Sequence, residues 1–116
     1  MKLRYIIIKV RDLQRAKDFY IRLLNKEPTK EEGNRMVVFD LENIKIGLYN
    51  PVADGDQLTE SDFGTNCRAA FGVDDVESEF DRISNFAEVT SRKKVDHHEW
   101  FEFKDSEGNI LEIHKI

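Results

Sequence analysis

The sequence predicts an α+β fold in which one βαβββ module occurs twice. Residues 5–13 read Tyr-Ile-Ile-Ile-Lys-Val-Arg-Asp-Leu, and residues 68–76 read Arg-Ala-Ala-Phe-Gly-Val-Asp-Asp-Val. Each segment is an apolar, strand-like run that ends in Val, followed by a charged residue, an Asp and the first apolar residue of a helix. Such an internal repeat indicates the architecture before any single residue does. Two copies of one module that face each other enclose a cleft, and the side chains lining that cleft determine what the protein does.

The first module is predicted as strand, helix and three strands. The β-branched run within residues 3–10 predicts a buried strand. Asp12 stands where a helix N-cap belongs, and the helix that follows ends at Asn25 and Pro28. Its apolar residues recur at helical spacing: Leu13, Ala16, Phe19, Tyr20, Leu23 and Leu24. A short strand at 29–31 and two strands at 36–41 and 44–49 complete the module.

The second module repeats this order. Residues 68–73 predict a strand, and Asp75 caps a helix that carries Val76, Phe80 and Ile83 on one side. Residues 86–90 predict the short strand. Strands at 99–104 and 110–115 form a hairpin around residues 105–109.

The segment between the modules has a different composition. Modules 1–50 and 67–116 are joined by linker 51–66, which contains Pro51, Gly55, Gly64 and four acidic residues but no Lys or Arg. It is longer than most connections between elements. The linker is either a plain connector or a lid over the cleft.

The bulk composition excludes several classes of function. The chain has 116 residues, a net charge of -5 and 40% apolar residues, which fits one acidic domain and opposes binding to nucleic acid or to an anionic membrane. Neither a membrane-spanning run nor a signal-peptide pattern is present, and Cys67 has no partner for an internal disulfide. We therefore expect a cytoplasmic protein, with Cys67 an inert residue of the core.

Two motifs carry a resemblance to a known family. Val-Asp-Asp-Val at 73–76 opens the second helix, and Lys-Asp-Ser-Glu-Gly-Asn-Ile-Leu-Glu-Ile at 104–113 forms the last hairpin. With the βαβββ repeat, these motifs resemble the vicinal oxygen chelate superfamily, although Ser106 replaces the family's usual Pro. This superfamily includes glyoxalase I, extradiol dioxygenases, fosfomycin-resistance enzymes and bleomycin-resistance proteins. The resemblance implies two modules that form a paired, cup-shaped mixed sheet.

The resemblance also implies where the family's enzymes hold a divalent metal. The two histidine positions fall on Tyr5 and Arg68, and the first module's last-strand position falls on Ile46, or on Gly47 if the register slips by one. Only Glu112 matches the family's ligands. A guanidinium is always charged and cannot ligate a metal. We therefore predict no metal at this position; the alternative is a divalent ion such as Zn, Ni, Mn or Fe.

Other residues leave alternatives open. Arg68 and Glu112 are expected to form an ion pair, which either fills a vestigial metal site or offers a handle to a polar ligand. Tyr5 either packs or donates its hydroxyl. His98, Glu112 and His114 could form a substitute metal site, and Trp100 is either the aromatic floor of the cleft or packs on the surface.

These observations predict a metal-free protein that binds a small molecule in the inter-module cleft. The expected cleft residues are Tyr5, Arg68, Trp100, Glu112 and His114. An acidic protein with aromatic side chains there favours a cationic, partly aromatic ligand, such as a drug sequestered by a bleomycin-resistance protein. Similarity to that group also implies a homodimer. The alternatives are a metal-dependent lyase or dioxygenase of the glyoxalase type with a rearranged metal site, and a fold used only for assembly.

Overall fold

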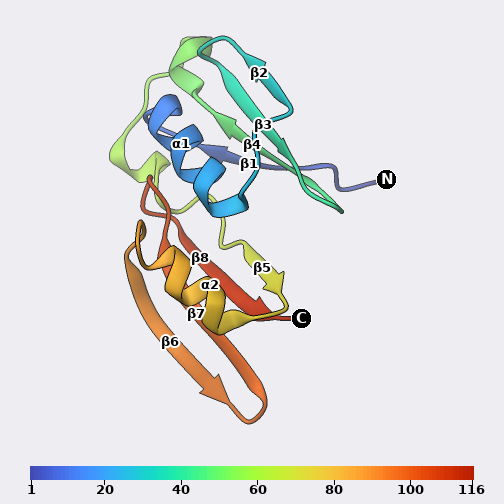
Figure 1. Ribbon diagram of the computed structural model, residues 1–116. Helices are drawn as coiled ribbons and strands as arrows, with labels where there is room; N and C mark the ends of the chain where they lie inside the picture. Colours follow the sequence, from blue (N-terminus) through green and yellow to red (C-terminus); the bar gives the residue numbers. More distant parts are fainter.

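The protein consists of two four-stranded mixed sheets, each covered by one helix (Figure 1). A computed structural model describes all residues from Met1 to Ile116. The strand order is β1-β4-β3-β2 in the first sheet and β5-β8-β7-β6 in the second. The first module contains β1 (Tyr5–Lys9), α1 (Leu13–Leu24), β2 (Lys30–Glu32), β3 (Met36–Asp40) and β4 (Lys45–Tyr49). The second contains β5 (Ala70–Val73), α2 (Val76–Ile83), β6 (Val89–Val95), β7 (His98–Lys104) and β8 (Ile110–Lys115). The predicted α+β fold of two βαβββ modules is confirmed.

The helix boundaries follow from the caps that the sequence predicts. The Asp12 carboxylate accepts a hydrogen bond from Arg15 N at 3.0 Å, and the Asp75 carboxylate accepts one from Ser78 N at 3.1 Å. Each bond satisfies a backbone donor that has no partner within the helix. Asn25 adopts the left-handed conformation, with φ at 54°, and ends α1.

One predicted strand is misplaced. Residues 86–90 were expected to form the short strand, but β6 spans Val89–Val95 and pairs with β7. The reason is Phe86, whose ring packs edge-on against Phe19 of α1 at a centroid distance of 5.6 Å and lies under the Arg22 guanidinium. Phe86 therefore packs between the two modules and is not part of a strand, although its apolar character suggested one.

Each sheet has one face toward its helix and one face turned away from it, which we call the open face. The helix-facing side chains of both modules form a single core of 15 buried residues. Its members include Ile8, Tyr20 and Phe39 from the first module and Phe101 and Leu111 from the second. No strand of one sheet pairs with a strand of the other. β1 and β5 are therefore edge strands, each with one unpaired side. The modules lie end to end in a molecule of 47 × 29 × 29 Å (Figure 1).

The turn at residues 105–109, between β7 and β8, forms hydrogen bonds that link the two modules. The Tyr20 hydroxyl of α1 donates to Asp105 Oδ2 at 2.6 Å, and Asn109 Nδ2 donates to the same oxygen at 2.9 Å. Glu107 accepts hydrogen bonds from Arg11 N and from the Arg15 guanidinium. Asp105, Glu107 and Asn109 are all buried. The motif that carried the family resemblance is therefore a docking element between the modules.

The segment 51–66 is held against both modules. It contains two short 3₁₀ turns, η1 (Pro51–Asp54) and η2 (Glu60–Asp62). Phe63 is buried beneath the Arg11 guanidinium. Asn66 donates its backbone N–H to Asn109 Oδ1 at 3.2 Å and its side-chain amide to Lys9 O at 3.4 Å. These contacts join the end of β1 to the docking turn, as a connector would.

None of the helices is long and apolar enough to span a bilayer.

Candidate functional site

Polar and aromatic side chains gather on the open face of the second sheet. Strand alternation sends Phe101 and Phe103 of β7 into the core and leaves Trp100 and Glu102 on the open face. On β8, the same alternation leaves Glu112 and His114 on the open face. Trp100 pairs with His114, and Glu102 pairs with Glu112. The hairpin register, which the sequence alone did not fix, thus brings these four side chains together.

Arg68 lies between the two carboxylates of this face. Its Nε donates to Glu112 Oε2 at 2.5 Å, and its Nη2 donates to Glu102 Oε1. Glu102 also accepts a hydrogen bond from Ser91 Oγ at 2.5 Å. Like charges directly opposite each other on neighbouring strands are destabilising, so the guanidinium offsets the repulsion between Glu102 and Glu112. The expected Arg68–Glu112 ion pair is present.

The exposure of this ion pair limits what it contributes to stability. The Arg68 side chain is 53% exposed, whereas those of Glu102 and Glu112 are 14% and 15% exposed. Hydrogen bonds from Arg68 and then from His114 hold the pKa of Glu112 below its usual value. Exposed ion pairs are weakly stabilising. Because about half of the Arg68 side chain is exposed, the guanidinium is accessible to a ligand from solvent.

His114 is held by three neighbours. Its Nε2 lies 2.7 Å from Glu112 Oε1, and its Nδ1 lies 2.8 Å from His98 Nε2. The Trp100 ring is parallel to the His114 ring within 6°, with centroids 5.6 Å apart. Trp100 thus contributes an aromatic surface within the site, in contact with both histidines.

Tyr5 lies on the other sheet. It is an edge-strand residue on the open face of the first module, 36% exposed, with Lys45 Nζ 5.7 Å from its ring centroid. The open face around it carries apolar side chains, such as Ile7 and Val38, and also the Lys45–Asp40 ion pair. Of the five predicted cleft residues, the structure brings Arg68, Trp100, Glu112 and His114 together, and it places Tyr5 apart from them on the first sheet.

The strand register decides which residue of the first module corresponds to Glu112. Ile7 pairs with Gly47, and its counterpart in the repeat, Ala70, pairs with Glu112. The corresponding residue is therefore Gly47. The prediction of Ile46 is wrong, because that side chain points into the core and is 1% exposed.

The residues at the family's metal position do not fit a metal ion. Gly47 has no side chain, and a Cβ added there would lie 2.9 Å from Ile7 Cδ1. Tyr5 and Arg68 occupy the two histidine positions, and Arg68 places a positive charge against the single matching ligand, Glu112. Nowhere in the chain do three His, Cys, Asp or Glu side chains form a group able to hold a metal.

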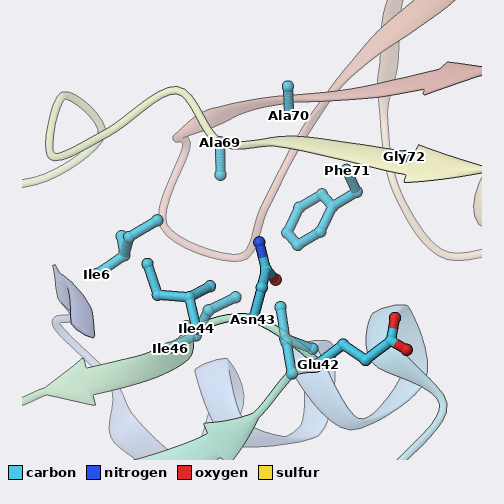
Figure 2. A pocket seen from close by; sticks show the side chains of 10 residues that line it. Ile6, Glu42, Asn43, Ile44, Ile46, Ala69, Ala70, Phe71 and Gly72 are labelled. Atoms are coloured by element: carbon cyan, nitrogen blue, oxygen red, sulfur yellow. The ribbon is translucent and has the colours of Figure 1, made fainter. Parts of the chain in front are cut away.

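A separate hollow of about 440 Å³ lies between the two modules (Figure 2). Ile6, Ile44 and Ile46 of the first module face Ala69 and Phe71 of the second, and Asn43 points toward Phe71. None of the five predicted cleft residues lines this hollow.

Sequence reasoning missed the part played by Glu102 and Ser91. Strand alternation puts Glu102 on the same face as Trp100, but only the register with Glu112 indicates that Arg68 joins the two carboxylates. Cys67 is half-buried, and burial raises the pKa of its thiol. This agrees with an unreactive residue.

Comparison with known proteins identifies the family. The model of the Glyoxalase/Bleomycin resistance protein/Dioxygenase superfamily matches residues 2–113, so the chain belongs to this superfamily. A search of curated proteins gave no match.

Several solved structures share the fold. The lactoylglutathione lyase of Agrobacterium tumefaciens superposes with a TM-score of 0.79 at 17% identity, over 98% of this chain and 92% of that one. The fosfomycin resistance protein FosX of Listeria monocytogenes gives 0.78 at 20% identity, over 100% and 93%. A glyoxalase / bleomycin resistance protein of Catenulispora acidiphila gives 0.75 at 17% identity, over 99% of each chain. At these identities the likeness establishes the fold alone.

Proposed function

We propose that this protein binds a small molecule on the open face of its second sheet, without a metal at the family's usual position. The observation that carries the proposal is Arg68. Its guanidinium stands at a position where the family's enzymes hold a metal ligand, and it is bound by the carboxylates of Glu102 and Glu112. The protein thus has a fixed, partly exposed hydrogen-bond donor in place of a Lewis acid.

The net charge of the chain and the rings of the site favour a cationic ligand with an aromatic part. On the open face itself, Arg68 and Lys93, which pairs with Trp100, balance the two negative charges of Glu102 and Glu112. The whole chain has a net charge of -5, which attracts cations at long range. Trp100 offers a ring face for stacking or for a cation–π contact.

We also propose that the protein works as a homodimer. The first sheet exposes apolar side chains beside the free edge of β1, where Leu3, Tyr5 and Ile7 are 78%, 36% and 42% exposed. Exposed apolar surface beside an unpaired strand edge is costly in a monomer. A second copy that covers these side chains would remove the cost.

The test is a thermal-shift screen of protein dialysed against EDTA. The compounds are a cationic glycopeptide of the bleomycin type, simpler cationic aromatic drugs, and fosfomycin as an anionic comparison. We expect a saturable rise in melting temperature with cationic aromatic compounds. The variants Arg68→Ala and Trp100→Ala should reduce it, whereas Val52→Ala, an exposed change in the linker, should not.

Two results would contradict the proposal. A flat response to all compounds would indicate a fold used for assembly alone. A response that appears only after Zn²⁺, Ni²⁺, Mn²⁺ or Fe²⁺ is restored, and that requires Glu112 but tolerates loss of Arg68, would indicate a metal-dependent lyase or dioxygenase instead.

A further inference from the structure

Two histidines on the open face of the second sheet have nitrogens that point at each other. His98 opens β7, and His114 lies near the end of β8, where it pairs with Trp100, two residues beyond His98. His98 Nε2 and His114 Nδ1 are 2.8 Å apart. We propose that these two nitrogens form a binding site for a divalent transition metal ion of the Ni²⁺, Cu²⁺ and Zn²⁺ class.

Glu112 prepares His114 for this role. The ionised carboxylate can only accept hydrogen bonds, so the Nε2 of His114, 2.7 Å from Glu112 Oε1, carries the ring's proton. The Nδ1 of a neutral His114 is then an unprotonated lone pair that faces His98. A carboxylate that orients a histidine in this way is the usual outer partner of a metal-binding imidazole.

The site is distinct from the position where the family's enzymes hold their metal. Glu112 uses Oε2 for Arg68 and Oε1 for His114, so the carboxylate separates the guanidinium from the histidine pair. The metal would lie on the far side of His114 from that carboxylate. It would therefore avoid the charge of Arg68, which opposes a metal at the family's position.

The geometry needs only a small adjustment. A metal ion would replace the proton that the two nitrogens share. Tetrahedral binding at about 2.0–2.1 Å from each nitrogen requires the nitrogens to lie roughly 3.3 Å apart, slightly more than the observed 2.8 Å. His98 is exposed and lies next to the tight turn at Asp96, where φ is 55°. Its ring can rotate outward without moving the core, and water would fill the remaining coordination positions.

The type of ligand determines which ions bind. Imidazole suits Ni²⁺, Cu²⁺ and Zn²⁺, whereas Mg²⁺ and Ca²⁺ prefer oxygen. Two imidazoles without a third protein ligand should therefore select transition metals and ignore Mg²⁺.

The protein contains its own reporter of this site. Trp100 is the single tryptophan of the chain. Its ring centroid lies 5.6 Å from that of His114 and 5.0 Å from that of His98. A Cu²⁺ or Ni²⁺ ion held between the histidines would quench its fluorescence.

The experiment is a titration of untagged, EDTA-dialysed protein with Ni²⁺ or Cu²⁺, followed by Trp100 fluorescence, with calorimetry for Zn²⁺. We expect saturation at one metal per chain and no response to Mg²⁺. His98→Ala and His114→Ala should each weaken binding at least tenfold. Glu112→Gln should weaken metal binding by about tenfold, at the lower end of the loss that follows when a residue orienting a metal ligand is replaced.

His97→Ala is the matched control, because His97 is the exposed neighbour of His98 and takes no part in the pair. Binding should survive this change. Non-saturable quenching would overturn the proposal, as would equal affinity in His98→Ala, His114→Ala and His97→Ala, with folding verified by circular dichroism. Because the titrant is the metal alone, failure here leaves the small-molecule proposal untouched.

Discussion

The two sheets have the same strand order but different side chains at the centre of their open faces. Ile7 and Gly47 form a cross-strand pair in the first sheet, and Ala70 and Glu112 form the corresponding pair in the second. The first face is apolar around this pair, whereas the second carries the cluster of Arg68, Trp100 and His114. The helix-facing residues of both modules are apolar and share one core. Packing therefore constrains one face of the repeated module, while the other face is free to differ.

The turns between the last two strands of each module differ in the same way. Asn43 in the first module's turn is exposed, whereas Asn109 in the second module's turn is buried. Asn109 donates to Asp105 and accepts from Asn66. Only the second module's turn is used to dock one module on the other.

Replacing Asn109 should have the largest effect on stability. Asn109→Ala leaves Asp105 Oδ2 and the N–H of Asn66 each short of a partner, at a cost of about 3 kcal/mol in the free energy of unfolding. Asn43→Ala should stay within about 0.5 kcal/mol. Urea unfolding of both variants measures the difference. Equal losses of unfolding free energy in the two variants would mean that the turn at residues 105–109 contributes no more to stability than the turn of the first module.

Restoring a carboxylate to the first sheet should have the next largest effect. Gly47→Glu places a Cβ against Ile7 Cδ1, which can move aside, and a carboxylate beside Val38, so it should cost about 2 kcal/mol, mainly through the partial burial of the charge. The double variant with Ile7→Ala should recover part of this loss. If Gly47→Glu alone is neutral in thermal unfolding, the two open faces are more alike than the structure indicates.

The buried hydroxyl of Tyr20 predicts a loss of stability in alkali. Burial, and then the charge and hydrogen bond of Asp105, raise the pKa of Tyr20 well above its usual value of about 10. Because the pKa of Tyr20 is higher in the folded than in the unfolded protein, the protonated hydroxyl contributes its full stabilisation below about pH 10. It is lost as the pH rises from there through the folded pKa.

Ile83 of the second helix occupies the position that corresponds to Tyr20, and its side chain does not titrate. Tyr20→Phe should cost about 1–2 kcal/mol at neutral pH and make the decline in unfolding free energy between pH 9 and 11 less steep. Tyr49→Phe provides the control, because Tyr49 bonds to Asp54 at an exposed site. A decline that both variants reduce equally would rule out a special role for burial.

Removing Arg68 should have the smallest effect on stability. Arg68→Ala leaves Glu102 opposite Glu112 without an intervening positive charge, so the urea midpoint should fall slightly, and less in high salt. Arg68→Ala combined with Glu102→Gln should restore it. A loss as large as that of Asn109→Ala would show that the guanidinium is mainly structural.

The sequence predicted most of the fold because the repeat and the caps are local signals. Asp12, Asp75 and Asn25 marked helix boundaries that the structure confirms. The position of β6 was missed because Phe86, apolar and adjacent to a strand, packs instead against the other module.

The candidate site was only partly predictable, because it depends on register. Strand alternation groups Trp100 with Glu102, and Glu112 with His114. It cannot decide which pairs meet across β7 and β8, or whether Ile46 or Gly47 corresponds to Glu112. The link from Arg68 to Glu102 spans 34 positions in sequence, and no local pattern indicates it. The ligand-binding role of these residues stays a prediction.

The most direct test of ligand binding on the second sheet is an NMR titration of EDTA-dialysed protein with a cationic aromatic compound that gives a thermal shift. We expect chemical-shift changes to concentrate at the Trp100 indole N–H and at the backbone amides of Arg68, Glu112 and His114. Changes concentrated instead around Ile7, Met36 and Gly47 on the first sheet, or around Phe71 in the hollow between the modules, would contradict it.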